Sequence, residues 1–290
     1  MADPGQVVGG RRVGLGDGPP RADVPATACP AATVILVRPG SSGGVEVFMV
    51  RRSASSRFAA NAYVFPGGTV SADDMSERVM ARTPGLTPAA AHARLAERGG
   101  VPPATPELSF GLHLAALREL FEEAGVLLAY DETASAASAD AEVYCAAPAQ
   151  VEREALQAGR LTFADTLERG RLIAAAERLV YFSHWITPSV SPLRFDTRFF
   201  VATMPPDQTA LHCQIETTEG DWLAPQEALA RRERGEIRIV FVTAEHLRLL
   251  ADVGSVDEAL RFACQKPIQT VQPAFDERGR EWIANVEGAW

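Results

Sequence analysis

The sequence lacks a long hydrophobic run. No stretch approaches the ~18–20 apolar residues that a helix needs to cross a bilayer. The longest apolar stretches, such as Ala32–Val37 and Val47–Val50, have the length of single strands. The first residues contain neither the apolar core nor the cleavage pattern of a secretory signal. We therefore expect a cytoplasmic protein that does not insert into a membrane.

Paired cysteines and an excess of positive charge are also absent. The four cysteines, Cys29, Cys145, Cys213 and Cys264, lie far apart and form no Cys-x-x-Cys pair. This spacing argues against a zinc site and for reduced thiols. With 28 basic and 37 acidic residues the net charge is −9, so we expect no general attraction to nucleic acid or to an anionic membrane. An anionic substrate would need a few local arginines or a metal ion.

Serine hydrolysis has little support, because no Gly-x-Ser-x-Gly elbow occurs. What is present is the composition of a soluble globular protein, with 47% hydrophobic and 22% charged residues. Four short apolar segments predict strands: Ala31–Arg38, Val45–Arg51, Phe199–Thr203 and Leu211–Ile215. Helical spacing occurs at 151–158, 163–179, 226–234 and 243–264.

This mixture of elements predicts a layered domain of the α/β (α+β) class. We expect a disordered tail over 1–30 and a main domain over 31–230, with insertions at about 75–111 and, in helical form, at about 134–179. Residues 231–290 are expected to form a helical extension packed on the same domain. Helical additions of this size often form dimer contacts, so a homodimer stays open.

The most informative element is the helix predicted at Leu112–Ala124, which Gly125 ends. At about 100° per residue, Glu119, Glu122 and Glu123 lie on one face and apolar residues on the other. Like charges at this spacing repel each other, and carboxylates near a helix C-terminus oppose the helix dipole. The cluster is therefore either a solvated acidic face or a site for a divalent cation, for which Mg²⁺ is well suited.

A family pattern covers this helix. Residues Arg118–Val126 (RELFEEAGV) match REUxEExGU, the C-terminal half of the Nudix box, at every specified position, and the lead-in Phe65–Gly68 (FPGG) is also typical of that family. With Gly68 as the first glycine of the box, the box glutamate falls on Asp74. The sequence therefore resembles the Nudix hydrolases. The resemblance implies an α/β/α sandwich with a mixed sheet and additional helices, and a metal-dependent hydrolase of diphosphates.

The spacing within the box departs from the family pattern. Between Asp74 and Arg118 lie 43 residues where the family has seven, so about 36 residues are inserted into a loop. Loops tolerate such insertions because the entropic cost of closing a loop grows only slowly with its length. Such an insertion resembles the coenzyme A diphosphatase branch. The stretch Arg52–Gly68 (RSASSRFAANAYVFPGG) resembles its signature RSxxxRxxxGxxxFPGG, although Asn61 replaces the glycine. We expect the inserted segment to cover part of the active site.

The resemblance assigns a role to each matching position. The implied ligands of Mg²⁺ or Mn²⁺ are Glu119, Glu122, Glu123, the backbone carbonyl of Gly67 and a distal acidic residue, Glu216 or Glu219, of which we prefer Glu216 by its spacing to Trp222. The implied catalytic residues are Arg118, which would brace the carboxylates, and Glu119 and Glu122, either of which could be the general base. The expected substrate-binding residues are Arg51, Arg52, Arg57 and Gly68.

Three functions remain open at this point. The first is hydrolysis of coenzyme A or an acyl-coenzyme A to 3′,5′-ADP and a 4′-phosphopantetheine species. The second is hydrolysis of ADP-ribose or another nucleoside diphosphate derivative. The third is a binding or regulatory module that has lost catalysis. In each hydrolase reading the partner is a small nucleotide diphosphate, and neither nucleic acid nor a membrane.

Overall fold

A mixed nine-stranded sheet lies at the centre of the molecule. The computed structural model describes residues 26–41, 43–56, 59–133, 150–213, 217–275 and 281–282. The strands of the sheet are β1 (Cys29–Pro39), β2 (Val45–Arg52), β3 (Ala62–Val64), β4 (Gly67–Thr69), β7 (Val180–Ile186), β8 (Phe195–Thr203), β9 (Thr217–Leu223), β10 (Arg238–Ile239) and β11 (Thr270–Val271). Their order is β10-β3-β2-β1-β8-β7-β11, with β4 paired to β1 and β9 paired to β2.

The described helices surround this sheet. They are α1 (Glu77–Ala81), α2 (Pro88–Glu97), α3 (Pro106–Ala124), α4 (Gln150–Gln157), α5 (Phe163–Gly170), α6 (Pro225–Glu233), α7 (Phe241–Leu250) and α8 (Val256–Gln265), with short 3-10 turns η1 (Asp73–Met75) and η2 (Ala176–Arg178). Two further antiparallel sheets pair β5 (Ala129–Asp131) with β6 (Leu172–Ala174) and β12 (Ala274–Phe275) with β13 (Glu281–Trp282). No helix in the described ranges is long and apolar enough to span a membrane.

Strand β1 divides the core into two. It runs parallel to β8 and antiparallel to β2, and side chains of a strand alternate between its two faces. Val34 and Leu36 face one apolar cluster, whereas Ile35 and Val37 face the other, and all four are fully buried. A strand covered on both faces reads as a continuous apolar run, which explains why the sequence predicts β1 well.

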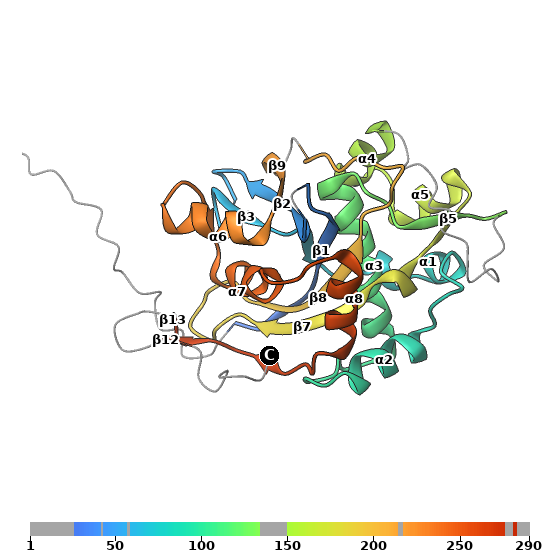
Figure 1. Ribbon diagram of the computed structural model, residues 1–290. Helices are drawn as coiled ribbons and strands as arrows, with labels where there is room; N and C mark the ends of the chain where they lie inside the picture. Colours follow the sequence, from blue (N-terminus) through green and yellow to red (C-terminus); the bar gives the residue numbers. More distant parts are fainter. Residues whose placement is uncertain are drawn as a thin grey trace, which may run out of the picture.

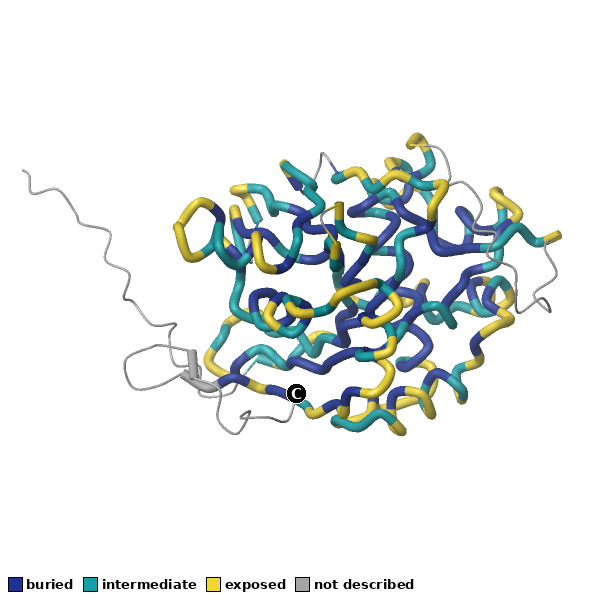
Figure 2. The backbone as a smooth tube through the Cα atoms, in the orientation of Figure 1, coloured by how far each residue is buried: buried dark blue, intermediate teal, exposed yellow. Residues whose placement is uncertain are grey.

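Helices cover both faces of the sheet. Helices α2 and α3 pack in the cluster that contains Val34, and α6, α7 and α8 pack in the cluster that contains Ile35. Figure 1 shows α3 on one side of the sheet and α7 and α8 on the other, and Figure 2 shows the buried residues concentrated along the central strands and α3. The predicted α/β/α sandwich with a mixed sheet is confirmed.

The central helix begins earlier than predicted, at Pro106 rather than Leu112. Thr105 caps its start by accepting a hydrogen bond from the Leu108 amide, and proline suits the first helical position. Gly125 ends the helix as predicted, with a φ of 68° in the left-handed region. The inserted segment at 75–111 thus supplies α1, α2 and the first turn of α3.

Several described strands were not predicted, β7 and β9 among them, and one predicted strand is wrong over its described part. Leu211–Cys213 has no regular structure, and residues 214–216 lie outside the described ranges. Strands β7 and β9 are mixed in polarity, so they lack the apolar run that marks β1. Residues 1–25 and 134–149 also lie outside the described ranges, and the division at residue 230 stays a prediction.

Candidate active site

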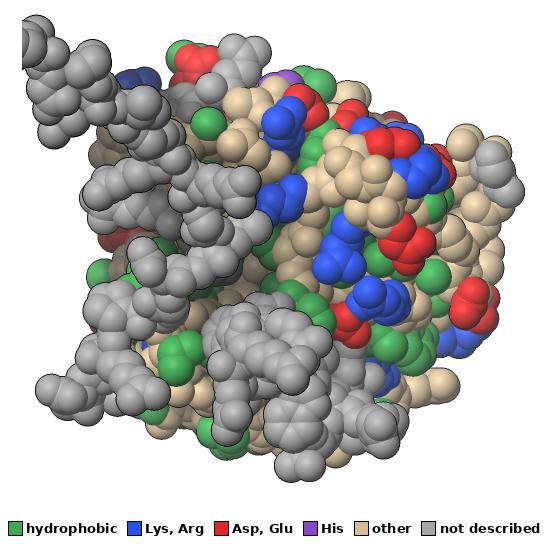
Figure 3. Space-filling view, turned by 90° about the vertical axis from the view of Figure 1, so that its left-hand side faces the viewer, with side chains coloured by type: hydrophobic (Ala, Val, Ile, Leu, Met, Phe, Trp, Pro, Cys, Tyr) green, Lys and Arg blue, Asp and Glu red, His purple; other side chains and the backbone are tan. Residues whose placement is uncertain are grey.

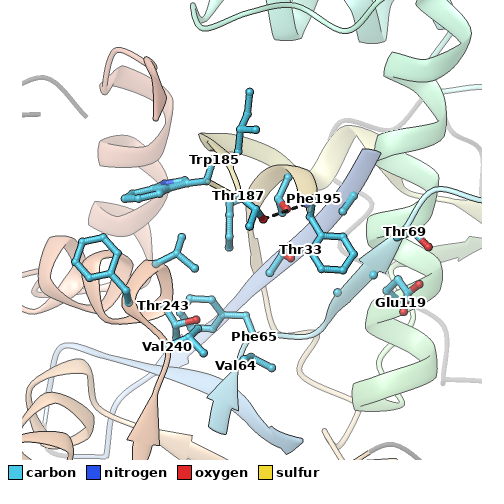
Figure 4. Close-up of a pocket in the computed structure, with 18 of the residues that line it drawn as sticks. Thr33, Val64, Phe65, Thr69, Glu119, Trp185, Thr187, Phe195, Val240 and Thr243 are labelled. Carbon is cyan, nitrogen blue, oxygen red and sulfur yellow. Dashed lines mark hydrogen bonds between the residues drawn. The ribbon is translucent and has the colours of Figure 1, made fainter. Parts of the chain in front are cut away.

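A pocket of about 490 Å³ opens where α3, β4, β7, β8 and the start of α7 meet. Glu119 and Thr69 lie at one end, and Trp185, Val240 and Thr243 lie at the other (Figure 4). The first end is rich in oxygen atoms and the second is lined largely by aromatic and aliphatic side chains. The pocket therefore suits a ligand with one strongly polar and one apolar part.

The last turns of α3 bring the three predicted glutamates to the polar end. Leu117, Leu120 and Phe121 are buried in the core, which turns Glu119 and Glu122 toward the pocket. Glu123 also lines the pocket although its side chain is nearly buried. The apolar face of the helix thus fixes the direction of its acidic face.

Two glycines of β4 allow this strand to lie close to both β1 and the acidic face of α3. A Cβ on Gly68 would lie 2.3 Å from Glu119 Oε1, and a Cβ on Gly67 would lie 2.6 Å from the Ala32 carbonyl oxygen. The Gly67 amide donates a 3.0 Å hydrogen bond to Glu123 Oε2. The Phe-Pro-Gly-Gly turn therefore places backbone directly beside the carboxylates.

Asp74, on which the box glutamate falls in the sequence, contacts Arg118 in the structure. Arg118 donates two hydrogen bonds to it, from Nε to Oδ1 at 2.8 Å and from Nη2 to Oδ2 at 3.0 Å. The Asp74 side chain is fully buried, and the Ser71 amide donates to it at 2.8 Å. The inserted segment therefore leaves this buried ion pair intact.

Arg118 also contacts the acidic face of α3. Its Nη1 donates to Glu119 at 2.7 Å and to Glu122 at 3.2 Å, and its Nη2 donates to the Thr69 carbonyl at 2.9 Å. The guanidinium thus joins Asp74, α3 and β4. This is the bracing position that the resemblance implies.

The oxygen atoms of these glutamates are ligands that a hard divalent cation prefers. Burial, together with the charges of Glu122 and Asp74, raises the pKa of Glu119 to about 7 although Arg118 opposes the shift. One guanidinium therefore does not balance the crowded carboxylates, and an ion with oxygen ligands would. Within the described ranges no three acidic, His or Cys side chains converge closely enough to hold a metal ion, and Arg118 is hydrogen-bonded to both Glu119 and Glu122.

The predicted arginines have different surroundings. Arg51 forms an ion pair with Glu219 at 2.6 Å, and Tyr63 also donates to Glu219. Neither Arg51 nor Glu219 lines the pocket, whereas Arg52 does. The Nε atom of Arg52 is buried and has no hydrogen-bond partner among the described residues. Arg57 and Glu216 lie outside the described ranges.

Asn61 takes a glycine-like conformation. Its φ is 59°, in the left-handed region that asparagine tolerates better than other side chains. The preceding turn is closed by a 3.0 Å hydrogen bond from the Ala62 amide to the Ala59 carbonyl. The one departure from the signature glycine is therefore compatible with the same backbone.

The prediction that the inserted segment covers the site is wrong. No residue of 75–111 lines the pocket. Buried Ala91 and Leu95 of α2 pack instead in the cluster of α3, as do Val79 and Leu86. The insertion thickens one layer of the sandwich rather than forming a lid.

The apolar end of the pocket was missed in the sequence. It is lined by Trp185 of β7, Phe195 and Phe199 of β8 and Phe241 of α7. The fold brings these residues together from separate segments of the chain.

Comparisons with known proteins agree with this geometry. Residues 25–242 match the family model described as the NUDT19 Nudix domain. The acyl-coenzyme A diphosphatase NUDT19 of Xenopus laevis is 25% identical over 255 residues, which cover 77% of this chain and 64% of that protein. The Gallus gallus protein of the same name is 27% identical over 252 residues, covering 77% of this chain and 66% of its own length. The chain thus spans less than two thirds of either relative.

A solved structure shares the fold over most of the chain. The crystal structure of a NUDIX hydrolase from Alicyclobacillus acidocaldarius is 26% identical and superposes with a TM-score of 0.61. The match covers 81% of this chain and 96% of that chain.

Proposed function

The chain belongs to the NUDT19 Nudix domain family, and on that premise we propose that it hydrolyses the diphosphate of coenzyme A or an acyl-coenzyme A. The products would be 3′,5′-ADP and a 4′-phosphopantetheine species. The observation that carries the proposal is one pocket with three carboxylates at its polar end and an aromatic, aliphatic opposite end. The names of the two vertebrate relatives support the same substrate class.

The carboxylates are proposed to hold Mg²⁺ or Mn²⁺. The ligands would be Glu119, Glu122, Glu123 and the Gly67 carbonyl, with Glu216 as a further ligand from the segment before β9. A bound divalent ion neutralises diphosphate charge and lowers the pKa of a coordinated water. Arg118 would keep two of the carboxylates oriented through its charge-assisted hydrogen bonds.

The chain's own residues would divide the remaining work. Glu119 or Glu122 would accept the proton of the attacking water. Arg52 would bind a substrate phosphate. It lines the pocket, and its buried Nε atom has no hydrogen-bond partner among the described residues. The apolar end would receive the pantetheine or acyl part of the substrate and exclude water there.

The distribution of charge supports a small substrate. On the described part of the face in Figure 3, basic and acidic side chains are interspersed rather than gathered into a track of one sign. A polyanion such as nucleic acid binds to continuous basic surface, whereas a single phosphate needs only one or two cations. The net charge of −9 points the same way.

Product analysis by mass spectrometry tests the substrate. The protein is incubated separately with coenzyme A, ADP-ribose and NADH, each with Mn²⁺ and with Mg²⁺. We expect 3′,5′-ADP from coenzyme A at the highest rate. Rapid cleavage of ADP-ribose without cleavage of coenzyme A would overturn the substrate class. Inertness of folded, metal-supplied protein toward all three would favour a non-catalytic module.

A further inference from the structure

The carbonyl groups at the end of α3 are satisfied by distant parts of the chain. A helix leaves its last four carbonyls without partners inside the helix. Here the Glu123 carbonyl accepts from the Cys213 amide at 3.1 Å, and the Ala124 carbonyl accepts from the Leu211 amide at 2.8 Å. Residues 211–213, named the strap from here on, are thus fastened along the helix end.

Arg153 of α4 joins the strap to the helix. Its Nε donates to the Glu122 carbonyl at 2.9 Å and its Nη2 donates to the Leu211 carbonyl at 2.8 Å. Gln157, one turn later, also donates to the Glu122 carbonyl. Gly125 leaves room for the guanidinium, since a Cβ there would lie 3.0 Å from Arg153 Nη1.

Burial of the Arg153 side chain costs more free energy than burial of an apolar side chain would. Arg153 is 2% exposed, and burying a charge costs free energy unless hydrogen bonds and opposite charges offset it. An apolar side chain would satisfy packing alone at lower cost. A cation at a helix C-terminus interacts favourably with the helix dipole, and this helix end carries two acidic side chains, Glu122 and Glu123.

The described chain resumes beside the strap. The Thr217 amide, at the start of β9, donates to the Cys213 carbonyl at 3.1 Å. The start of β9 is therefore tied to the strap, and the strap is tied to the end of α3. In the sequence, Cys213 stands three positions before Glu216.

We propose that Arg153 is a positioning residue of the metal site. It would hold the turn that carries Glu122 and Glu123 in place by joining the Glu122 carbonyl to the strap. The inference rests on the proposed function of these carboxylates. Groups that orient ligands without touching the ion change metal affinity by about 10- to 100-fold when removed.

Direct Mn²⁺ binding, measured on the full chain by electron paramagnetic resonance, tests this role. We expect Arg153→Gln to weaken Mn²⁺ affinity by about 10-fold or more. Arg153→Lys should recover part of the loss, because its single ammonium keeps the charge but cannot bridge two carbonyls as the guanidinium does. Wild-type affinity in Arg153→Gln would overturn the proposal. So would tighter binding, which would mean that Arg153 acts only by repelling the ion.

A matched variant separates positioning from folding. Leu156 lies on the same helix and is buried, so Leu156→Ala should lower the melting temperature without changing Mn²⁺ affinity by more than about twofold. An equal loss of affinity in Leu156→Ala would show that any loosening of α4 suffices, and the proposal fails. If Arg153→Gln does not fold, the Mn²⁺ affinities of Arg153→Lys and Gln157→Ala are compared with that of Leu156→Ala instead.

Mn²⁺ binding distinguishes an error in the metal site from an error in the role of Arg153. If the wild-type chain binds no Mn²⁺, the metal site of the proposed function is wrong. If the wild type binds Mn²⁺ and loses it in Glu122→Gln but not in the Arg153 variants, only the positioning role is wrong.

Discussion

Arg51 and Arg52 are neighbours in β2 that the sequence treats alike and the structure separates. A register shift between them in the pairing with β9 accompanies this difference. Arg51 is held by Glu219 outside the pocket, and Arg52 lines it. Which of two adjacent arginines faces a ligand depends on strand pairing, and no feature of the local sequence reports it.

These two arginines provide a paired test at the residue scale. We expect Arg52→Gln to raise the KM for coenzyme A about 10-fold, since a charge-assisted hydrogen bond to phosphate contributes about 1.5–3 kcal/mol. Arg51→Gln breaks only a solvent-exposed ion pair and should change KM by less than about twofold. Steady-state kinetics with coenzyme A and dephospho-coenzyme A measure both effects. Equal KM values for the two variants would contradict the assignment of Arg52.

Gly68 gives a second residue-scale prediction. An added Cβ would clash with the Glu119 carboxylate, so Gly68→Ala should lower kcat by about 10²-fold through misplacement of a reacting group. Gly159 has a φ of 66° and nothing near its Cβ position. Gly159→Ala should therefore cost about 1 kcal/mol of stability and leave kcat unchanged. Normal kcat in Gly68→Ala would show that Glu119 need not keep its position.

The individual elements differ in how well the sequence predicts them. Most of helix α3 was predicted because local spacing determines it. The contact between Asp74 and Arg118 could be inferred only through the family pattern, since the sequence alone does not show how a long insertion folds back. Strand β9 and the strap were missed because their pairing depends on β2 and α3, which are distant in the chain.

The link between η1 and α3 can be tested through Asp74. Asp74→Asn removes the charge partner of a nearly buried arginine, and such losses typically cost about 3–5 kcal/mol. Because Arg118 keeps Glu119, Glu122 and the Thr69 carbonyl, we expect the lower end of that range. Urea denaturation measures the change in the free energy of unfolding. A change below about 1 kcal/mol would mean that the insertion, rather than this ion pair, holds η1.

At the scale of the whole molecule, both core layers contain a buried histidine. Burial lowers the pKa of His113 to about 4 and the pKa of His246 to about 3. Both residues are fully packed, His113 beside Phe200 and His246 beside Phe199. Their ordinary value is 6.5, so each stays neutral in the folded chain where the unfolded chain takes up a proton.

Stability should therefore fall on acidification. Above pH 6.5 neither histidine adds a pH dependence. Between pH 6.5 and about 4, each lowers the free energy of unfolding by about 1.4 kcal/mol per pH unit, because only the unfolded chain binds the proton. Urea denaturation at pH 6 and pH 5 measures the slope. His113→Gln should reduce it by one histidine's share, and an unchanged slope would contradict the burial argument.

The three-layer α/β/α architecture was predictable from the alternation of apolar segments and from the family resemblance. The pocket was predictable only in part. Its carboxylates lie in one motif, but its apolar end combines β7, β8 and α7 from the second half of the chain. A site assembled across the two core layers becomes visible only when the sheet order is known.

We propose above that the acidic face of α3 supports hydrolysis of a diphosphate. The most direct test follows 3′,5′-ADP released from coenzyme A with saturating Mn²⁺, for the wild type and for Glu122→Gln of equal melting temperature. We expect equimolar 3′,5′-ADP and 4′-phosphopantetheine from the wild type, and a rate at least about 10²-fold lower in the variant. Equal rates in the two proteins, or no 3′,5′-ADP from the wild type, would contradict the account.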